Sequence, residues 1–217
     1  MLEQQHTGPR LHAPGRDELR ADLLRIADWI APQSKVLDLG CGGGSLLHHV
    51  TSHREVQGWG IELSEAKLVT CVQRGVNVIQ GDLNEADLLS SFTDGQFDVA
   101  VMSLALQALK RPDETLLELL RVGREGIVTF PNFGHWRCRL QIARGKMPVT
   151  GSLPTRWYET DNIHLCTVRD FEQLCAEKGI QIIERAVMDR HHLSSWRAQA
   201  MPNLFGEIAQ YRLRLDG

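Results

Sequence analysis

The stretch VLDLGCGGG at residues 36–44 holds the first side chains whose types and spacing point to chemistry. It joins an apolar, strand-like run to a helix-like run. Glycine lets the backbone turn tightly there and approach a ligand closely, and the helix that follows offers free N–H groups at its start. Asp38 precedes the turn from inside the strand. Its carboxylate would repel a pyrophosphate, and it suits a ligand with an ammonium or sulfonium group.

The spacing of the glycines separates two classes of nucleotide-like ligand. A dinucleotide site has the pattern G-x-G-x-x-G. Here glycines stand at positions 40, 42, 43 and 44, so the third glycine comes one residue early and Ser45 follows. This spacing disfavours an NAD(P)-dependent enzyme.

Two further acids follow at the ends of the next two expected strands. Glu62 stands 18 residues beyond Gly44, and a carboxylate at such a strand tip can accept both ribose hydroxyl protons. Asp82 could accept a proton from an adenine amino group, with Leu63 and Leu83 on the two sides of the ring. Taken alone, each acid could be a helix N-cap or a solvated loop residue. The order and spacing of the set instead fit one ligand at the carboxyl edge of a parallel sheet.

Short apolar segments that alternate with helical ones must position these groups. Strands are expected at residues 35–39, 56–63, 76–80, 97–103 and 126–130. Helices are expected at 17–30, from 45, at 65–74 with Ser64 as cap and Gly75 after the end, and at 113–122 behind Pro112. The alternation predicts an α/β fold with a doubly wound, mostly parallel sheet covered on both faces.

The pattern changes after the fifth strand. Residues 131–166 are rich in Pro, Gly, Trp and Arg and show little regular periodicity, and a connection of that length usually has a function. A capping box then opens a helix at Thr167 with Asp170, and two closing strands are expected at 181–187 and about 204–213. We expect one domain over residues 17–217, preceded by a flexible arm at 1–16, with 131–166 as a lid or partner-contact segment.

Composition excludes several classes of protein. A net charge of −3 and a pI near 6.3 argue against a general nucleic-acid binder. No uncharged apolar run is long enough to span a bilayer, and residues 1–16 lack the apolar core of a signal peptide. The five cysteines are scattered without a CxxC pair, which favours reduced thiols in a cytoplasmic protein over a disulfide framework or a zinc site.

The DLGCGGG turn followed by a strand-tip acid resembles the class I S-adenosylmethionine-dependent methyltransferases over residues 35–130. The resemblance implies a Rossmann-like, seven-stranded sheet with an antiparallel last strand. It also implies S-adenosylmethionine or S-adenosylhomocysteine as ligand. The methionine moiety would be held by the turn, the ribose by Glu62 and the adenine by Asp82 and Leu83. The full candidate cofactor set is Asp38, Gly40, Cys41, Gly42, Gly44, Glu62, Leu63, Asp82, Leu83 and Ser103.

A narrower resemblance extends over most of the chain. The segments QRGVNVIQGDLNE, FPNFGHWRCRLQ, GKMPVT and RWYETDNIHLCT are similar to those of the MetW family, the methionine biosynthesis protein W. This resemblance implies a role in bacterial methionine synthesis. It also implies association with a homoserine O-acyltransferase as partner.

The set of catalytic groups is sparse for a methyltransferase. The segment after the fourth strand offers only Ser103 and Gln107, and the Asn-Pro-Pro-aromatic motif that orients an amine is absent from the sequence. His135 is the best candidate base, because a neutral imidazole can act near pH 7. Two other readings stay open for it: a structural histidine at the start of a short helix, and a contact with a partner.

The same long segment supplies the candidate substrate or partner residues. Trp and Arg are enriched among interface anchors, which favours contact with a partner. Arg156 could also bind a substrate carboxylate or simply be solvated, and His164 is expected to order the chain before Thr167. The candidates are Asn132, Trp136, Arg137, Arg156, Trp157, Tyr158 and His164.

These observations favour an S-adenosylmethionine-binding, MetW-like protein that assists or regulates a homoserine O-acyltransferase by direct contact. The alternative is a small-molecule methyltransferase with residues 131–166 as substrate lid. We expect no nucleic-acid or membrane partner. His49 and His53, four residues apart on a helix, suggest no metal site without a third ligand.

Overall fold

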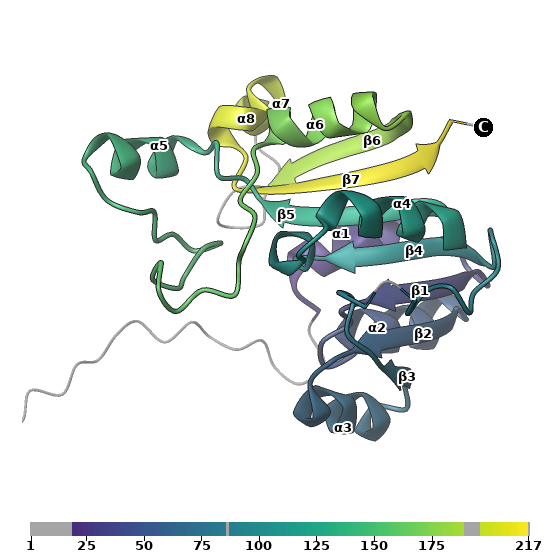
Figure 1. The fold of residues 1–217 in the computed structure, drawn as a ribbon. Helices are drawn as coiled ribbons and strands as arrows, with labels where there is room; N and C mark the ends of the chain where they lie inside the picture. The colour runs from purple at the N-terminus through teal and green to yellow at the C-terminus, as the bar shows by residue number, and fades with distance from the viewer. Residues whose placement is uncertain (1–18, 86, 189–195, 217) are drawn as a thin grey trace, which may run out of the picture.

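The computed structural model describes residues 19–85, 87–188 and 196–216, and Figure 1 shows them as a single sheet with helices on both faces. The seven strands are ordered β3-β2-β1-β4-β5-β7-β6. They are β1 (Lys35–Leu39), β2 (Gln57–Glu62), β3 (Asn77–Gln80), β4 (Phe97–Ser103), β5 (Gly123–Pro131), β6 (Ile180–Met188) and β7 (Ile208–Leu215). The helices are α1 (Ala21–Trp29), α2 (Ser45–Arg54), α3 (Glu65–Gln73), the 3-10 turn η1 (Leu106–Ala108), α4 (Pro112–Val122), α5 (Trp136–Ala143), α6 (Val168–Glu177), α7 (Trp196–Ala200) and α8 (Pro202–Phe205).

The strand directions confirm the expected fold class. β1 to β5 pair in parallel with their neighbours, whereas β7 runs antiparallel to both β5 and β6. The register sets Leu39 opposite Ile61 and Ser103 opposite Thr129. The carboxyl ends of β1, β2 and β4 therefore meet at one edge of the sheet, where open α/β folds bind their ligands.

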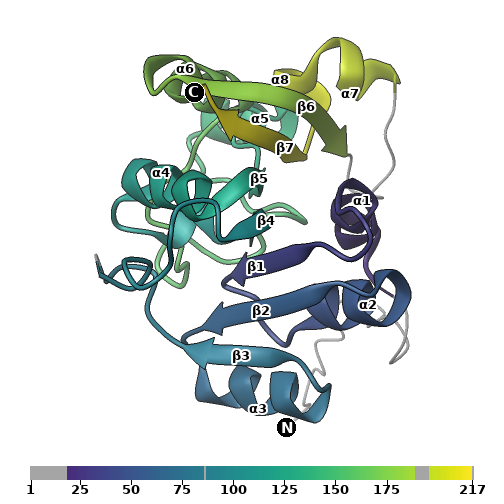
Figure 2. The ribbon, with the colours of Figure 1, turned by 90° about the vertical axis from the view of Figure 1, so that its right-hand side faces the viewer.

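Alternation along the strands assigns side chains to the two faces. In β4, Val99 and Val101 pack with α1 and α2, whereas Ala100 and Met102 pack with α4 and α6. Figure 2 shows α4 and α6 on one side of the sheet and α1 and α2 on the other. Because both faces are covered, the central strands are apolar on both faces, as expected for buried parallel strands.

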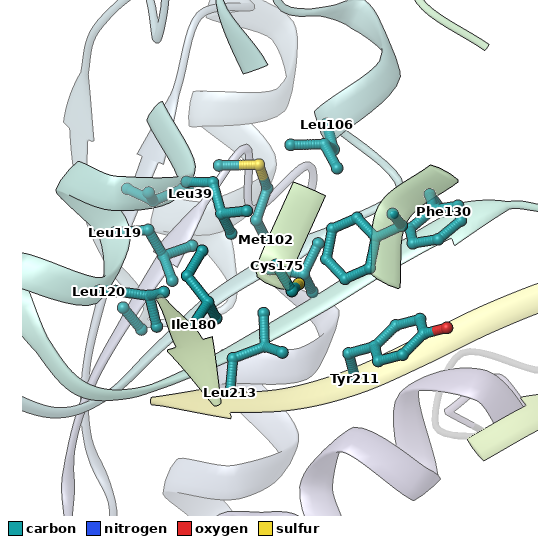
Figure 3. Close-up of a cluster of buried hydrophobic side chains, with 14 of the residues drawn as sticks. Leu39, Met102, Leu106, Leu119, Leu120, Phe130, Cys175, Ile180, Tyr211 and Leu213 are labelled. Atoms are coloured by element: carbon teal, nitrogen blue, oxygen red, sulfur yellow. The ribbon is translucent and has the colours of Figure 1, made fainter. Parts of the chain in front are cut away.

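An aromatic group closes the core between the last strands and α6. The ring of Phe171 lies 4.8 Å from that of Phe130 and 4.7 Å from that of Tyr211, centroid to centroid. Figure 3 shows Phe130 and Tyr211 among the buried leucines of this cluster. The Tyr211 hydroxyl donates to Glu172 Oε1 at 3.0 Å, so the only polar atom of its side chain is satisfied.

Most expected boundaries agree with the structure to within one or two residues, apart from the starts of α1, β5 and β7. α1 begins at Ala21, four residues after the expected start. β5 begins at Gly123, three residues before the expected start, and β7 begins at Ile208 because residues 202–205 form α8 instead. Ser64 stands at the N-cap of α3, but its side chain makes no capping bond. The capping box of Thr167 and Asp170 is confirmed. The arm at 1–16 lies outside the described residues.

Candidate functional site

The glycine turn lies at the carboxyl edge of the sheet, between β1 and α2. The N–H groups of Gly40 and Cys41 both donate to the Ile61 carbonyl, which ties the turn to the end of β2. Gly40 has φ +75°, and a Cβ on it would lie 3.2 Å from the Ala105 Cβ. Gly42 also has a positive φ but faces open space, with nothing within 4 Å of an added Cβ. The turn is thus tightly packed behind Gly40 and open at Gly42, which fits a loop that cradles a ligand.

Glu62 braces this turn from the end of β2. Its Oε2 accepts from the Gly42 N–H at 2.8 Å and its Oε1 from the Ser64 N–H at 2.9 Å. The backbone N–H of Ser64 thus donates to Glu62, although the Ser64 hydroxyl does not cap α3. Lys67 Nζ lies 3.9 Å from Oε1. Each carboxylate oxygen can accept more than one hydrogen bond, so Glu62 keeps capacity for the two hydroxyls of a ribose.

Asp38 is buried at the floor of the site and is incompletely satisfied. Its Oδ1 has no hydrogen-bond partner, and its side chain lies on the same face of β1 as Val36. Burial raises the pKa of Asp38 to about 7, and the nearby Glu62 carboxylate adds to the rise. A buried carboxyl oxygen without a partner is costly. A ligand ammonium group would donate to that oxygen, and a sulfonium nearby would offset the negative charge of the carboxylate, so the residues present fit S-adenosylmethionine.

The acids and leucines expected at the adenine end lie on the same edge. Asp82 Oδ1 accepts from both the backbone N–H and the side-chain amide of Asn84, each at 2.9 Å. Its other oxygen is left for a donor such as an adenine amino group. Leu83 packs near Gly40, with its Cδ1 3.8 Å from an added Cβ there, whereas Leu63 is 58% exposed. A cavity of about 140 Å³ opens beside Leu83.

The end of β4 contributes a strained backbone turn to the site. Ser103 Oγ lies 3.2 Å from Thr129 Oγ1, and the Leu104 N–H donates to the same threonine. Leu104 has φ +55°, a conformation unusual for a residue with a large side chain. Gln107 then donates its amide to the Leu104 carbonyl at 2.8 Å. This fixed turn places Ala105 against Gly40 and carries the chain into η1.

Asn132 lies directly after β5, and both the nitrogen and the oxygen of its side-chain amide are hydrogen-bonded to backbone groups around it. Its Nδ2 donates to the carbonyls of Pro202, Asn203 and Gly206. Its Oδ1 accepts from the Gly134 and Val168 N–H groups. These bonds join β5, α6, α8 and the start of the long segment at one point. The structure therefore gives Asn132 an organising position, and a role in contacting substrate or partner stays a prediction.

His135 is buried at the N-cap of α5. Its Nδ1 accepts from the Arg137 N–H at 3.4 Å. Burial lowers the pKa of His135, while the buried Glu207 carboxylate acts in the opposite direction. The neutral imidazole with an accepting Nδ1 carries its proton on Nε2. This arrangement agrees with a structural histidine at the start of a helix, and a role as base stays a prediction.

The remaining candidates lie along residues 136–164. The end of this stretch is hydrogen-bonded to η1. Arg156 Nη1 donates to the Tyr158 hydroxyl at 2.7 Å, and the rings of Trp157 and Tyr158 meet edge to face. Arg137 lies over the exposed ring of Trp136, 5.3 Å from its centroid. The N–H groups of Ile163 and His164 both donate to the Gln107 carbonyl. The structure therefore holds the His164 backbone against η1, next to the end of β4, whereas Trp136 and Trp157 are exposed.

Several residues that shape the site carry no separate sequence signal. Thr129 and Glu207 are both buried polar residues, and Leu104 holds a positive φ. The pairing of β5 with β4 and β7 is what places the first two. His49 and His53 stack on each other at 4.3 Å, and no three potential ligands converge on a metal position within the described ranges. No helix of the described chain has both the length and the apolar character to cross a bilayer.

Solved structures share this architecture. An S-adenosylmethionine-dependent methyltransferase from Archaeoglobus fulgidus superposes with a TM-score of 0.65 at 15% identity, covering 89% of this chain and 91% of that one. The [4+2]-cyclase SpnF superposes with a TM-score of 0.61 at 19% identity, covering 90% and 80%. At these identities the likeness shows the class I methyltransferase fold, and a cyclase with the same fold means that the fold alone does not decide the reaction.

Sequence comparisons identify the family of the chain within this fold. A bifunctional methionine biosynthesis protein MetXA/MetW from Rhodopirellula baltica is 32% identical over 218 residues, which is 96% of this chain but 34% of that protein. The chain thus spans about a third of that relative's length. The family model for the methionine biosynthesis protein MetW matches residues 20–213. Together with the glycine turn and its strand-tip acids, these matches show that the chain belongs to the MetW family.

Proposed function

We propose that this protein binds S-adenosylmethionine or S-adenosylhomocysteine at the carboxyl edge of the sheet and, by direct contact, assists or regulates a homoserine O-acyltransferase in the cytoplasm. The observation that carries the partner role is the Rhodopirellula relative, which joins MetXA and MetW in one chain. We take the MetXA part as the acyltransferase. Joining two modules raises their effective concentration for each other, which supports a functional contact between the separate proteins as well.

The ligand part of the proposal rests on the chain's own residues. Asp38 supplies a buried carboxyl oxygen that lacks a partner, and Glu62 holds the turn while keeping acceptor capacity. The bound molecule would supply an activated methyl group on its sulfonium. The residues around it bind and orient that molecule. His135, the best candidate base, is already used as the cap of α5, which favours binding over methyl transfer.

Hydrogen bonds through Gln107 link the carboxyl edge of the sheet with residues 133–165. Leu104 follows the end of β4, and Gln107 is bonded to it through its side chain. The carbonyl of Gln107 in turn accepts from Ile163 and His164. Occupancy of the edge can therefore bias how residues 133–165 are held. Such coupling requires that the ligand bind one state of the complex more tightly than another.

The test is the steady-state rate of the organism's own homoserine O-acyltransferase, measured alone, with this protein, and with this protein plus S-adenosylmethionine. We expect the protein to change the rate and the ligand to alter that change. Glu62→Ala should lose the ligand effect, while the matched surface variant Glu177→Ala on α6 should keep it. If Glu62→Ala abolished binding but left all control of the acyltransferase intact, the sensor role would be wrong.

The methyltransferase neighbours favour a second candidate function, a small-molecule methyltransferase with residues 131–166 as lid. Its signature is conversion of S-adenosylmethionine to S-adenosylhomocysteine that depends on an acceptor from a cell extract. If the acyltransferase rate does not respond and such turnover is found, this second function replaces the first.

A further inference from the structure

Residues 136–158 carry many large apolar side chains that are exposed to solvent. Of the seventeen large apolar side chains that are exposed in the described chain, seven lie in these twenty-three residues, a density that marks an interaction site. Trp157 is 70% exposed and Met147 49%. Figure 1 shows α5 and the chain after it standing away from the sheet, beyond the carboxyl ends of β4 and β5. We call residues 136–158 the basic–apolar segment.

The charge of this segment is entirely of one sign. No Asp or Glu occurs from residue 126 to residue 158, whereas Arg137, Arg139, Arg144, Lys146 and Arg156 lie within it. None of the five has a carboxylate partner among the described residues. Because the whole chain carries −3 and this segment carries +5, the rest of the chain carries −8 with histidines counted as neutral. The positive charge is therefore concentrated on the same segment as the exposed apolar side chains.

The basic–apolar segment is held in shape by its own hydrogen bonds. Only Cys138 is buried among the eight residues of α5, so packing contributes little to this helix. Instead, the Gln141 side chain and the Val149 backbone exchange two bonds, both at 3.1 Å. Arg139 Nε donates to the Gly134 carbonyl. An isolated helix of this length is marginal in water, and these ties keep it ordered with its apolar side chains outward, which lowers the entropic cost of docking.

We propose that the basic–apolar segment is the docking surface for the homoserine O-acyltransferase, and that it seats on an acidic, partly apolar face of that enzyme. The inference rests on the proposed function for the identity of the partner. The chemistry of the partner's face follows from these five cations, which have no carboxylate partner in the described part of the chain, and from the exposed Trp157 and Trp136, because Arg and Trp are common anchors of protein interfaces.

Other occupants fit the charges less well. Two copies of this chain related by a twofold axis through the segment would bring five positive charges against five. Nucleic acid or an anionic membrane would be attracted by the segment but repelled by the net −8 of the remaining chain. A protein face of opposite charge meets neither objection.

The proposal is tested by the dissociation constant of this protein, full chain, with the organism's own acyltransferase, at two salt concentrations and with S-adenosylmethionine saturating throughout. Lys146→Glu with Arg156→Glu reverses two exposed charges, and Trp157→Ala removes the most exposed ring of the segment. Arg124→Glu, at the opposite end of β5, and Val72→Ala, exposed on α3, are the matched controls. Binding of S-adenosylmethionine by each variant checks that its fold is intact.

We expect each segment variant to weaken the complex roughly tenfold or more, while the controls bind as the wild type does. Salt should weaken the wild-type complex and affect the doubly reversed variant far less. If the wild type binds but the segment variants bind equally well, the docking surface is overturned and the proposed function stands. If the wild type does not bind at all, the proposed partner itself fails. If the variants lose binding to RNA or to phosphatidylserine vesicles while keeping the acyltransferase, the segment serves one of those ligands instead.

Discussion

The buried carboxyl of Asp38 should make ligand binding depend on pH around neutrality. Burial, with a smaller effect from Glu62, raises its pKa to about 7. A cationic ligand needs the ionised form, so below pH 7 binding carries the extra cost of removing a proton. Between pH 6 and pH 8 the ionised fraction rises from about one tenth to about nine tenths, so the dissociation constant of S-adenosylmethionine should fall roughly tenfold over that range.

The same shift has a consequence for the free protein. The folded-state pKa lies above the ordinary value of 3.8, so the contribution of Asp38 to stability is full below pH 3.8 and is lost as the pH rises through about 7. The difference of about three pKa units corresponds to about 4 kcal/mol. Asp38→Asn removes this loss, so without ligand the variant should unfold at higher urea concentration than the wild type at pH 8, with little difference near pH 4.

Isothermal titration at pH 6, 7 and 8 together with urea denaturation at pH 4 and pH 8 checks both consequences. Asp38→Asn should bind S-adenosylmethionine more weakly at pH 8 and with little dependence on pH. A wild-type dissociation constant that is flat from pH 6 to 8, together with wild-type affinity in Asp38→Asn, would refute the reasoning. The carboxyl would then not be the partner of the ligand's positive charge.

Three further predictions concern side chains that hydrogen-bond to the backbone around the site. Glu62→Gln replaces one of two accepting oxygens by an amide, so S-adenosylmethionine affinity should fall roughly tenfold and the free energy of unfolding by about 1–3 kcal/mol; an unchanged titration would contradict this. Asn132→Ala leaves several buried backbone groups without hydrogen-bond partners. The free energy of unfolding measured by urea denaturation should therefore fall by about 3 kcal/mol or more. His135→Ala should speed hydrogen exchange at the Arg137 amide, whereas His135→Asn should preserve the cap. Because the pKa of His135 is lowered, its cap should be present above pH 6.5 and be lost as the pH falls through that lowered value.

The features that the sequence predicts well are those that depend on local patterns. The glycine turn, the acid at the end of β2 and the capping box of Thr167 each follow from neighbouring residues, and each lies where it was expected. The doubly wound, mostly parallel sheet also follows, because strands that alternate with helices leave few topologies. The identity of the ligand that these residues hold stays a prediction.

The features that could not be predicted depend on residues far apart in the chain. Nothing near Asn132 reveals that its amide binds carbonyls 70 to 74 residues away. The expected start of β7 is too early, because the sequence at residues 202–205 contains apolar side chains but gives no sign that α8 forms there. The position of Glu207 beside His135 depends on the pairing of β7 with β5 and β6, which no local signal fixes.

The long segment enters and leaves the body of the protein at nearly one point. The Phe133 N–H donates to the Cys166 carbonyl at 3.0 Å, and Asn132 reaches across to the Val168 N–H. The thirty-odd residues between them form a long loop whose two ends are fixed next to each other. Such a loop can change in length or in surface residues at small entropic cost. If this segment contacts the proposed partner, its surface can change while the strand-tip acids stay in place, so the proposed partner contact and the proposed ligand site could evolve at separate rates.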